Sequence, residues 1–241
     1  MSLSRDIADW IKQKVEESKA EGIIVGLSGG VDSACVAALS KMAVGDNVLG
    51  LILSCQSDSL DEQLARIVAD KFKIKLEKIC LDEVYEKFAS ILPEANKLTL
   101  ANLKPRLRMV ALYYFANKLN YLVAGTGNKS EALVGYFTKY GDGGVDILPL
   151  AELLKTEVRE LAKELDVPNE VIERVPTAGL WEGQTDEGEL GVKYEELDEA
   201  ILAIESGKED KFPNQDIVAK VKELMQASEH KRQPIAIYKK G

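Results

Sequence analysis

A glycine-rich loop at residues 26–33 constrains the fold of this chain more than any other stretch. It reads Gly26-Leu27-Ser28-Gly29-Gly30-Val31-Asp32-Ser33, follows the apolar run 23–25 and precedes the helical-looking run 34–44. Glycines let backbone N–H groups approach phosphate oxygens closely, and the start of a helix adds partial positive charge. The order strand, turn and helix therefore predicts an anion-binding cradle.

The residues that end this loop indicate which phosphate chemistry it serves. The other common phosphate loop carries a Lys-Ser or Lys-Thr pair after its last glycine. Here Asp32 and Ser33 stand in that place. A carboxylate there can hold the Mg²⁺ that a pyrophosphate leaving group requires. The pattern S-G-G-x-D-S resembles the signature of the ATP pyrophosphatases, which split ATP into AMP and pyrophosphate. Glycine-rich loops also occur for structural reasons, but this placement favours function.

The alternation of apolar runs and helical periodicity predicts the fold class. Strands are expected at about 23–27, 48–53, 74–76 and 121–125, and helices at about 3–20, 33–44, 60–68, 152–165, 194–205 and 214–228. Such alternation implies right-handed crossovers and a doubly wound, parallel α/β sheet of the Rossmann-like kind. Ligands of these sheets bind at the carboxyl ends of the strands, where the loops after residues 27 and 125 lie.

Two further stretches are predicted to differ in secondary structure, one helical and one a long loop. Residues 82–118 are expected to be mainly helical, with interruptions near Pro93 and Pro105. Residues 176–193 are rich in glycine and acids and lack clear periodicity. A loop of that length in a compact domain is often a lid or a mobile segment.

Composition excludes some classes of partner. The 241 residues fit one large α/β domain or two small ones, and 31 basic against 40 acidic side chains give a net charge of −9. A general nucleic-acid binder needs a basic face, so no nucleic-acid partner is expected. No apolar run approaches the roughly 20 residues that span a bilayer, and the charged start is not a signal peptide. We therefore expect a cytoplasmic protein without a membrane partner.

A second polar cluster occupies residues 125–150. Glu131 opens a helix after a strand and is a second candidate Mg²⁺ ligand, while Lys139 and Lys155 could meet phosphates or a carboxylate. The alternatives are that Glu131 is a solvated helix residue and that the Gly141–Gly144 stretch is only a turn. Composition alone leaves the two interpretations about even.

The order of several segments resembles that of the ammonia-dependent NAD⁺ synthetases, which belong to the adenine nucleotide alpha hydrolase-like superfamily. The resemblance covers nearly the whole chain. It is carried by the loop at 26–33 and by segments 102–109, 125–126, 135–146, 148–150, 175–178 and 228–232. The loop marks only the wider superfamily, whereas 135–150 and 228–232 are far more specific.

The resemblance implies a role for individual residues. Residues 26–33 would bind the ATP phosphates, and Asp32 and Glu131 would hold Mg²⁺. The residues that would contact ATP or its products are Thr126, Lys155 and Thr177. Those that would contact deamido-NAD⁺ are Arg106, Lys139, Asp146, His230 and Lys231. Lys155 and Asp142 are the expected catalytic residues, with Asp142 placed near the reacting carboxyl.

Two positions depart from the bacterial members of that family. They often have Gln where this chain has Val31, and Gly-Thr-Asp-His where it has Gly125-Thr126-Gly127-Asn128. The cradle uses backbone N–H groups, so Val31 is expected to be harmless. Gly127-Asn128 removes a carboxylate beside the site, so a role for that acid has no support in this chain.

The implied reaction is the last step of NAD⁺ biosynthesis. The nicotinate carboxylate would attack the α-phosphate of ATP, giving an acyl-adenylate and pyrophosphate, and ammonia would then displace AMP. No cysteine sits in a G-x-C-x-G turn, so we expect one synthetase domain over 1–241, no glutaminase domain and free ammonia as the donor. A homodimer is implied, with 82–118 as its candidate surface. The rivals are the synthetase half of GMP synthase and a non-catalytic adenine-nucleotide sensor.

Overall fold

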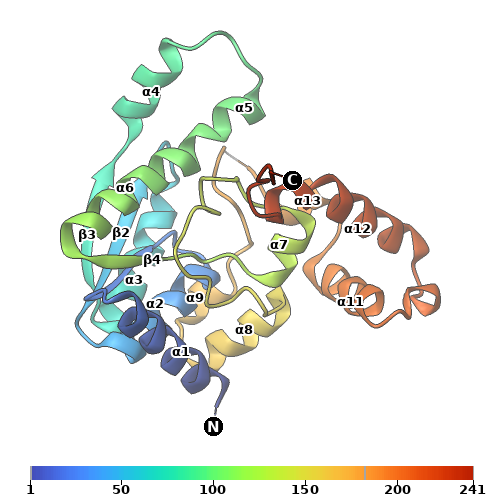
Figure 1. The fold of residues 1–241 in the computed structure, drawn as a ribbon, viewed down its shortest axis with the longest axis horizontal. Coiled ribbons are helices and arrows are strands. Elements are labelled where there is room, and N and C mark those ends of the chain that lie inside the picture. The colour runs from blue at the N-terminus through green and yellow to red at the C-terminus, as the bar shows by residue number, and fades with distance from the viewer. Residues whose placement is uncertain (1, 182, 241) are drawn as a thin grey trace.

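The computed structural model describes residues 2–181 and 183–240 and has a four-stranded parallel sheet at its centre (Figure 1). The strand order is β3-β2-β1-β4. The strands are β1 (Gly22–Gly26), β2 (Val48–Ser54), β3 (Lys75–Cys80) and β4 (Tyr121–Ala124). The chain runs outward from β1 to β3 and then returns to place β4 on the other side of β1. The sheet therefore has a topological switch point between β1 and β4, where such sheets bind ligands.

The helices surround the sheet and extend to one side of it. They are α1 (Leu3–Ser18), α2 (Val31–Val44), α3 (Ser59–Phe72), α4 (Asp82–Ser90), α5 (Lys97–Ala101), α6 (Leu103–Leu119), α7 (Lys129–Val134), α8 (Lys155–Glu164), α9 (Asn169–Ile172), α10 (Asp186–Leu190), α11 (Tyr194–Glu205), α12 (Gln215–Ala227) and α13 (Glu229–Arg232), with a 3₁₀ turn at Glu209–Lys211. Among the described residues, none of these helices is both long and apolar enough to cross a membrane.

Both faces of the sheet are covered by helices, which confirms the predicted doubly wound α/β class. Ile23 and Val25 of β1 pack into a cluster with α1, α2, α3 and α8, whereas Ile24 packs into another with α6. Successive side chains of a strand point to opposite faces, so a strand buried on both sides reads as a continuous apolar run. That is why β1 and β2 were predictable from sequence.

A separate hydrophobic cluster holds the helices that lie beside the sheet. Tyr194, Leu197 and Ile201 of α11 pack against Val221 of α12 and Val134 of α7. Figure 1 shows α11 and α12 beyond α7 and α8, away from the strands. These helices thus form a helical unit with its own core, next to the carboxyl-end region of the sheet.

Local details differ from the predicted boundaries. The helix that contains Pro105 begins at Leu103, so this proline lies in the first turn of α6 and the break comes before it, not at it. Proline is tolerated in a first turn because its missing N–H would have no partner within the helix. The stretch 176–193 contains the short helix α10, although residue 182 lies outside the described residues. The short helix α9 was not predicted.

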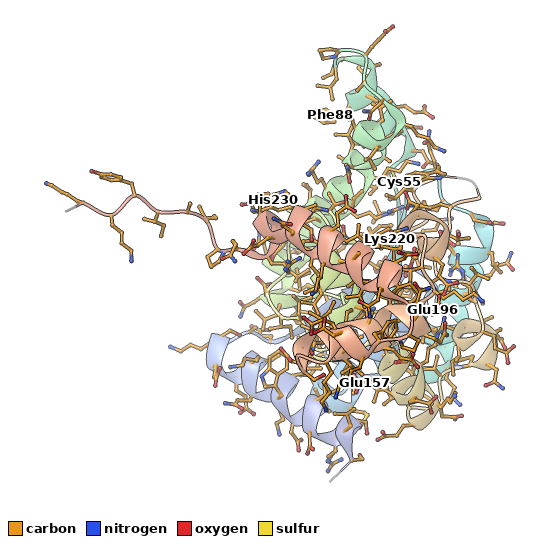
Figure 2. All side chains as sticks on the ribbon, turned by 90° about the vertical axis from the view of Figure 1, so that its right-hand side faces the viewer. Cys55, Phe88, Glu157, Glu196, Lys220 and His230 are labelled. Atoms are coloured by element: carbon orange, nitrogen blue, oxygen red, sulfur yellow. The ribbon has the colours of Figure 1, made fainter. Side chains whose placement is uncertain are left out.

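A glycine fixes how the helical unit meets the C-terminal segment. Gly135 ends α7 with φ of +70°, and a Cβ on it would lie 2.0 Å from that of Ser228. Only glycine allows both this conformation and this approach. The chain after α13 then extends away from the body, as Figure 2 shows.

Candidate active site

The glycine-rich loop forms the turn between β1 and α2. Gly29 adopts φ of +76°, and Gly30 is the N-cap of α2, so Asp32 and Ser33 lie in the first helical turn. The buried Ser33 hydroxyl donates to the Gly30 carbonyl (2.9 Å) and accepts from the Ser28 N–H (3.3 Å). Ser33 therefore holds the loop in shape, which leaves the first turn of α2 at the carboxyl end of β1.

Lys155 binds both carboxylates that were predicted from sequence to hold Mg²⁺. Its Nζ lies 2.5 Å from Oδ2 of Asp32 and 3.0 Å from Oε1 of Glu131. The three side chains come from the starts of α2, α7 and α8. Only 3% of the Lys155 side chain is exposed, against 15% for Asp32 and 16% for Glu131. The fold thus brings together three candidate residues that lie far apart in the sequence.

Burial and charge act in opposite directions on these groups. Burial raises the pKa of the Glu131 carboxyl, and the charge of Lys155 lowers it. Burial alone lowers the pKa of the Lys155 ammonium, but Asp32 and Glu131 outweigh it and raise that pKa above its ordinary value. Lys155 is therefore a permanent cation at neutral pH.

The helical unit positions Lys155. The backbone N–H of Lys155 donates to the Ser130 hydroxyl (2.9 Å), and that hydroxyl donates to Asp198 of α11. The other Asp198 oxygen accepts from the N–H of Thr156 (2.8 Å), so Asp198 satisfies the start of α8. The Tyr194 ring lies 5.0 Å from the Lys155 nitrogen, a cation–π distance.

Asn128 links the start of α7 to Asp32. Its side-chain oxygen accepts from the N–H of Glu131 (3.0 Å), and Glu131 accepts from the N–H of Asn128 (3.4 Å), which is a capping box. The Asn128 amide also donates to Oδ1 of Asp32 (2.8 Å). Asn128 therefore ties the cap of α7 to one of the two candidate Mg²⁺ carboxylates.

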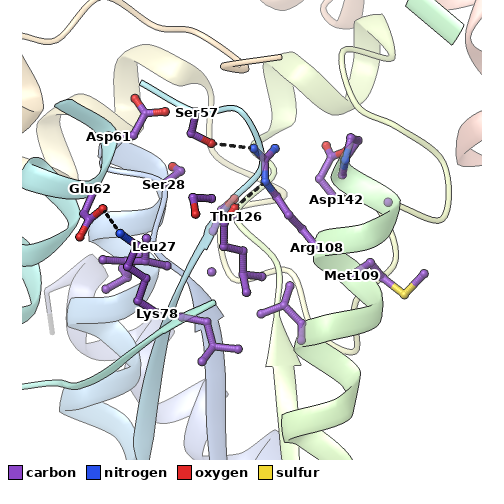
Figure 3. A pocket seen from close by; sticks show the side chains of 18 of the residues that line it. Leu27, Ser28, Ser57, Asp61, Glu62, Lys78, Arg108, Met109, Thr126 and Asp142 are labelled. Atoms are coloured by element: carbon purple, nitrogen blue, oxygen red, sulfur yellow. Dashed lines mark hydrogen bonds and ion pairs between the residues drawn. The ribbon is translucent and has the colours of Figure 1, made fainter. Parts of the chain in front are cut away.

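A cavity of about 430 Å³ opens at the carboxyl ends of β1, β2 and β4 (Figure 3). Gly26, Leu27, Ser28, Thr126 and Asp142 line it, so it joins the loop to the polar cluster at 125–150. Its walls also include Arg108 of α6, which donates to the Leu53 carbonyl (3.0 Å) and to the Ser57 hydroxyl (3.1 Å). The volume suits a nucleoside-sized ligand.

Asp142 and Thr177, both predicted from sequence, line different hollows of the surface. Asp142 accepts from the N–H of Thr138 (2.9 Å), and burial raises the pKa of its carboxyl. Thr177 does not line the cavity among the described residues; it lines a neighbouring open groove, together with Arg174.

The residues predicted to contact deamido-NAD⁺ lie on connected segments. Arg106 donates to the Lys139 carbonyl (3.3 Å), and the Lys139 ammonium donates to the His230 carbonyl (2.8 Å). Lys231 donates to the carbonyls of Gly135 (2.7 Å) and Phe137 (3.0 Å). The C-terminal segment is thereby tied to the segment after α7.

Asp146 is the exception in that set. Its carboxylate accepts from the N–H of Val123 (2.8 Å) and from the Tyr113 hydroxyl (3.0 Å). It is thus attached to β4 and α6, apart from the Arg106–Lys139–His230 series.

Comparison with known proteins identifies the family. The family model described as NAD synthase matches residues 3–235. The chain belongs to the NAD synthase family. Its relative from Carboxydothermus hydrogenoformans, named NH(3)-dependent NAD(+) synthetase, is 48% identical over 94% of this chain and 92% of the relative. The resemblance stated from sequence is therefore confirmed, and the GMP synthase rival is set aside.

Two solved structures match the whole fold. The NMN synthetase from Francisella tularensis superposes with a TM-score of 0.90, at 36% identity over 99% of both chains. The NH3-dependent NAD synthetase from Campylobacter jejuni superposes with a TM-score of 0.87, at 29% identity over 99% of this chain and all of that one. The family consists of enzymes, so this chain is one too.

The carboxylates of this NAD synthase fit the Mg²⁺ that its family implies. Within residues 2–181 and 183–240, no three His, Cys, Asp or Glu side chains gather as a complete metal site. Mg²⁺ is commonly bound by one or two carboxylates plus substrate phosphates and water. Asp32 and Glu131 face one cation together, so they meet that requirement.

Three residues that support this NAD synthase site were not predicted from its sequence. Tyr194 and Asp198 lie in α11 and reach Lys155 only through the packing of the helical unit. No local pattern marks them. Asn128, in contrast, follows the N-x-x-E pattern of a capping box, which the sequence does display.

Replacing Lys155 with Met is expected to destabilise the protein by about 3–5 kcal/mol at neutral pH, because two buried carboxylates lose their cation. Chemical denaturation of variant and parent measures this. The deficit should shrink toward pH 5. An acid with a raised folded-state pKa costs stability at high pH, and the cost vanishes below its unfolded value, which is about 4.3 for Glu.

Lys163→Met is the matched control, because Lys163 lies on the same helix in an exposed pair with Glu160. Its cost should stay under about 1 kcal/mol. Equal costs for the two variants would mean that Lys155 does not neutralise a buried pair.

Proposed function

We propose that the chain catalyses the ATP-dependent amidation of deamido-NAD⁺ with ammonia, which gives NAD⁺, AMP and pyrophosphate and is the last step of NAD⁺ biosynthesis. The observation that carries this proposal is the buried Lys155 between Asp32 and Glu131, beside a glycine-rich loop and a nucleoside-sized cavity. The NAD synthase family match supplies the reaction class.

In this proposal the cavity takes the adenosine part of ATP, and residues 26–33 take its phosphates. Backbone N–H groups at the start of α2 and the helix dipole favour the negative charge of phosphates. Asp32 and Glu131 are the proposed Mg²⁺ ligands. Bound there, Mg²⁺ would neutralise charge on the phosphates and make pyrophosphate a better leaving group.

Lys155 acts on the first chemical step. The substrate carboxylate attacks the α-phosphorus, the bond from that atom to the bridging oxygen breaks, and pyrophosphate leaves with the electron pair. The Lys155 ammonium, held by α8, stabilises the negative charge that develops on phosphate oxygens. The remaining contribution is positioning, since the acyl-adenylate forms without a side-chain nucleophile.

The proposed deamido-NAD⁺ surface is formed by Arg106, Lys139, His230 and Lys231. Three of these are cations by type, and their contacts join α6, the segment after α7 and α13. A dinucleotide presents two phosphates, which such cations bind well. Asp146 is a further proposed contact, and Thr126 and Thr177 are proposed contacts of ATP or its products.

Ammonia is the proposed nitrogen donor, and Asp142 is the proposed group that receives its proton. Burial raises the pKa of the Asp142 carboxyl, which makes it a stronger base than an exposed aspartate. The curated relative is named for ammonia and is covered over 92% of its length. We therefore propose a single synthetase domain over residues 1–241.

A second substrate follows from one of the structural relatives. The Francisella tularensis protein is named an NMN synthetase. Nicotinate mononucleotide carries the same nicotinate carboxyl as deamido-NAD⁺ but lacks the adenylate half. The adenylation chemistry at Lys155 is equally suited to both, so the distinction lies with the surface around Arg106 and Lys139.

A homodimer is proposed through the helices α4, α5 and α6. Large apolar side chains stand exposed on them, namely Val84, Phe88, Ile91, Leu98, Val110 and Tyr114. Figure 2 shows Phe88 near the far end of the molecule from α1. Exposed apolar groups in such number on neighbouring helices are typical of a protein interface. Arg106 lies on α6, so a second copy would border the deamido-NAD⁺ surface.

The reaction itself is tested with ATP, Mg²⁺, deamido-NAD⁺ and ammonium, assayed for NAD⁺, AMP and pyrophosphate. Equal amounts of the three products are expected, with no ADP and little turnover of glutamine. Asp32→Asn should lower kcat by about 10²-fold or more, because it removes a proposed Mg²⁺ ligand. Asp46→Asn, at an exposed aspartate, should change nothing.

ADP as the product would contradict the proposed bond cleavage. A parallel reaction with nicotinate mononucleotide decides the substrate. A higher kcat/KM for that compound would replace deamido-NAD⁺ with it as the substrate while leaving the adenylation chemistry intact.

Asp142→Asn is expected to slow the amidation half of the reaction by about 10²-fold, because an amide cannot take a proton from ammonium. The variant keeps the acceptor for the Thr138 N–H, so the turn should stay folded. Rapid-quench measurement of pyrophosphate without ammonium should show an unchanged burst. Full ammonia-dependent turnover by this variant would remove the role of Asp142.

Val110→Asp is expected to convert the dimer to a monomer, because it places a charge in the apolar surface of α6. Sedimentation velocity measures the change. Leu202→Asp, at a similarly exposed position on α11, should leave the dimer intact. A parent chain that sediments as a fully active monomer would refute the proposed interface.

A further inference from the structure

The cavity proposed for ATP has more acidic than basic side chains on its walls. The acids that line it are Asp58, Asp61, Glu62, Asp82 and Asp142. The cations among its described lining residues are Lys78 and Arg108. ATP carries about four negative charges at neutral pH, so unpaired acids there would repel it. The ATP phosphates, proposed to bind at residues 26–33 beside these acids, therefore call for cations from outside this lining.

Two of these acids form ion pairs, one with Lys78 and the other with Arg174. Lys78 lies 2.7 Å from Glu62. A dashed line marks this ion pair in Figure 3. Asp61 pairs with Arg174, which reaches it from the segment that follows α9. Only 15% of the Arg174 side chain and 19% of the Asp61 side chain are exposed. This pair is therefore more sheltered than the exposed ion pairs of the surface.

The guanidinium of Arg174 lies against the phosphate-binding loop. Its Nη1 donates to the Ser28 carbonyl (3.3 Å) and lies 3.1 Å from where a Cβ on Gly29 would stand. Among the described residues, Arg174 donates hydrogen bonds to Ser28 and Asp61. A guanidinium carries five N–H donors, so others remain to bind a ligand. Asp61 and Ser28 together fix the plane of the group.

Thr177 connects the same segment to the proposed reaction. It stands three residues after Arg174, and both line the groove beside the loop. The segment thus brings a fixed cation and a hydroxyl to one edge of the cradle. A guanidinium that is already oriented loses little entropy when it binds phosphate, and it can bind two oxygens at once.

We propose that Arg174 is a phosphate-binding residue of the ATP site, which Asp61 holds in place for that purpose. The inference rests on the proposed ATP site. It predicts that the two partners of one ion pair have opposite effects on ATP affinity. Removing the cation weakens ATP binding. Asp61→Asn keeps an Oδ1 acceptor for Arg174 and takes only a negative charge from the cavity, so it does not weaken ATP binding.

The test is isothermal titration of the whole chain with ATP and, separately, with adenosine, in the absence of deamido-NAD⁺ and ammonium. Arg174→Gln should weaken ATP binding by about 10- to 100-fold, the range of a charge-assisted hydrogen bond, and leave adenosine binding unchanged. Asp61→Asn should keep or tighten ATP binding. Arg174→Lys should restore part of the loss. Arg66→Gln is the control, because Arg66 pairs with Glu62 on the exposed side of α3.

A purely structural pair gives a different pattern. Arg174→Gln and Asp61→Asn would then weaken ATP and adenosine alike, and the double variant would be no worse than either; that pattern overturns the inference. Parent-like ATP affinity in Arg174→Gln overturns it too, without touching the proposed function. A parent chain that binds neither ATP nor adenosine overturns the proposed ATP site and this inference with it.

Discussion

The ion pairs of Lys155 with Asp32 and Glu131 are the interaction on which the rest of the site depends. Two carboxylates in a largely buried place repel each other, and a cation between them offsets that repulsion. Lys155 supplies it and so permits the starts of α2, α7 and α8 to meet. The same charges that stabilise the fold are the ones that the proposed chemistry uses.

The sheet determines where this meeting takes place. Because all four strands are parallel, their carboxyl ends share one edge, and the reversal of strand order beside β1 separates the helices there. Each of the three helices begins near this edge, so their N-terminal charges add. The glycine-rich loop and the cavity then lie next to the lysine as a consequence of topology.

Sequence predicted those parts of the molecule that local signals encode. The strands read as apolar runs, and the loop at 26–33 showed its strand and helix on either side. The meeting of Asp32, Glu131 and Lys155 followed from the family resemblance, not from spacing. Tyr194 and Asp198 could not be predicted, because they reach Lys155 only after the helical unit packs. Arg174 is similar: its partner Asp61 is far away in the chain, and no motif joins them.

The contact between the two hydrophobic cores has a consequence for partial unfolding. Lys155 belongs to the sheet side, but Asp198 and Tyr194, which hold the start of its helix, belong to the helical unit. Loosening of α11 would release the lysine while the strands stayed intact. In such a state the amides of the sheet would stay protected from hydrogen exchange, although the active site would be incomplete. The less stable of the two cores therefore limits how well activity withstands destabilising conditions.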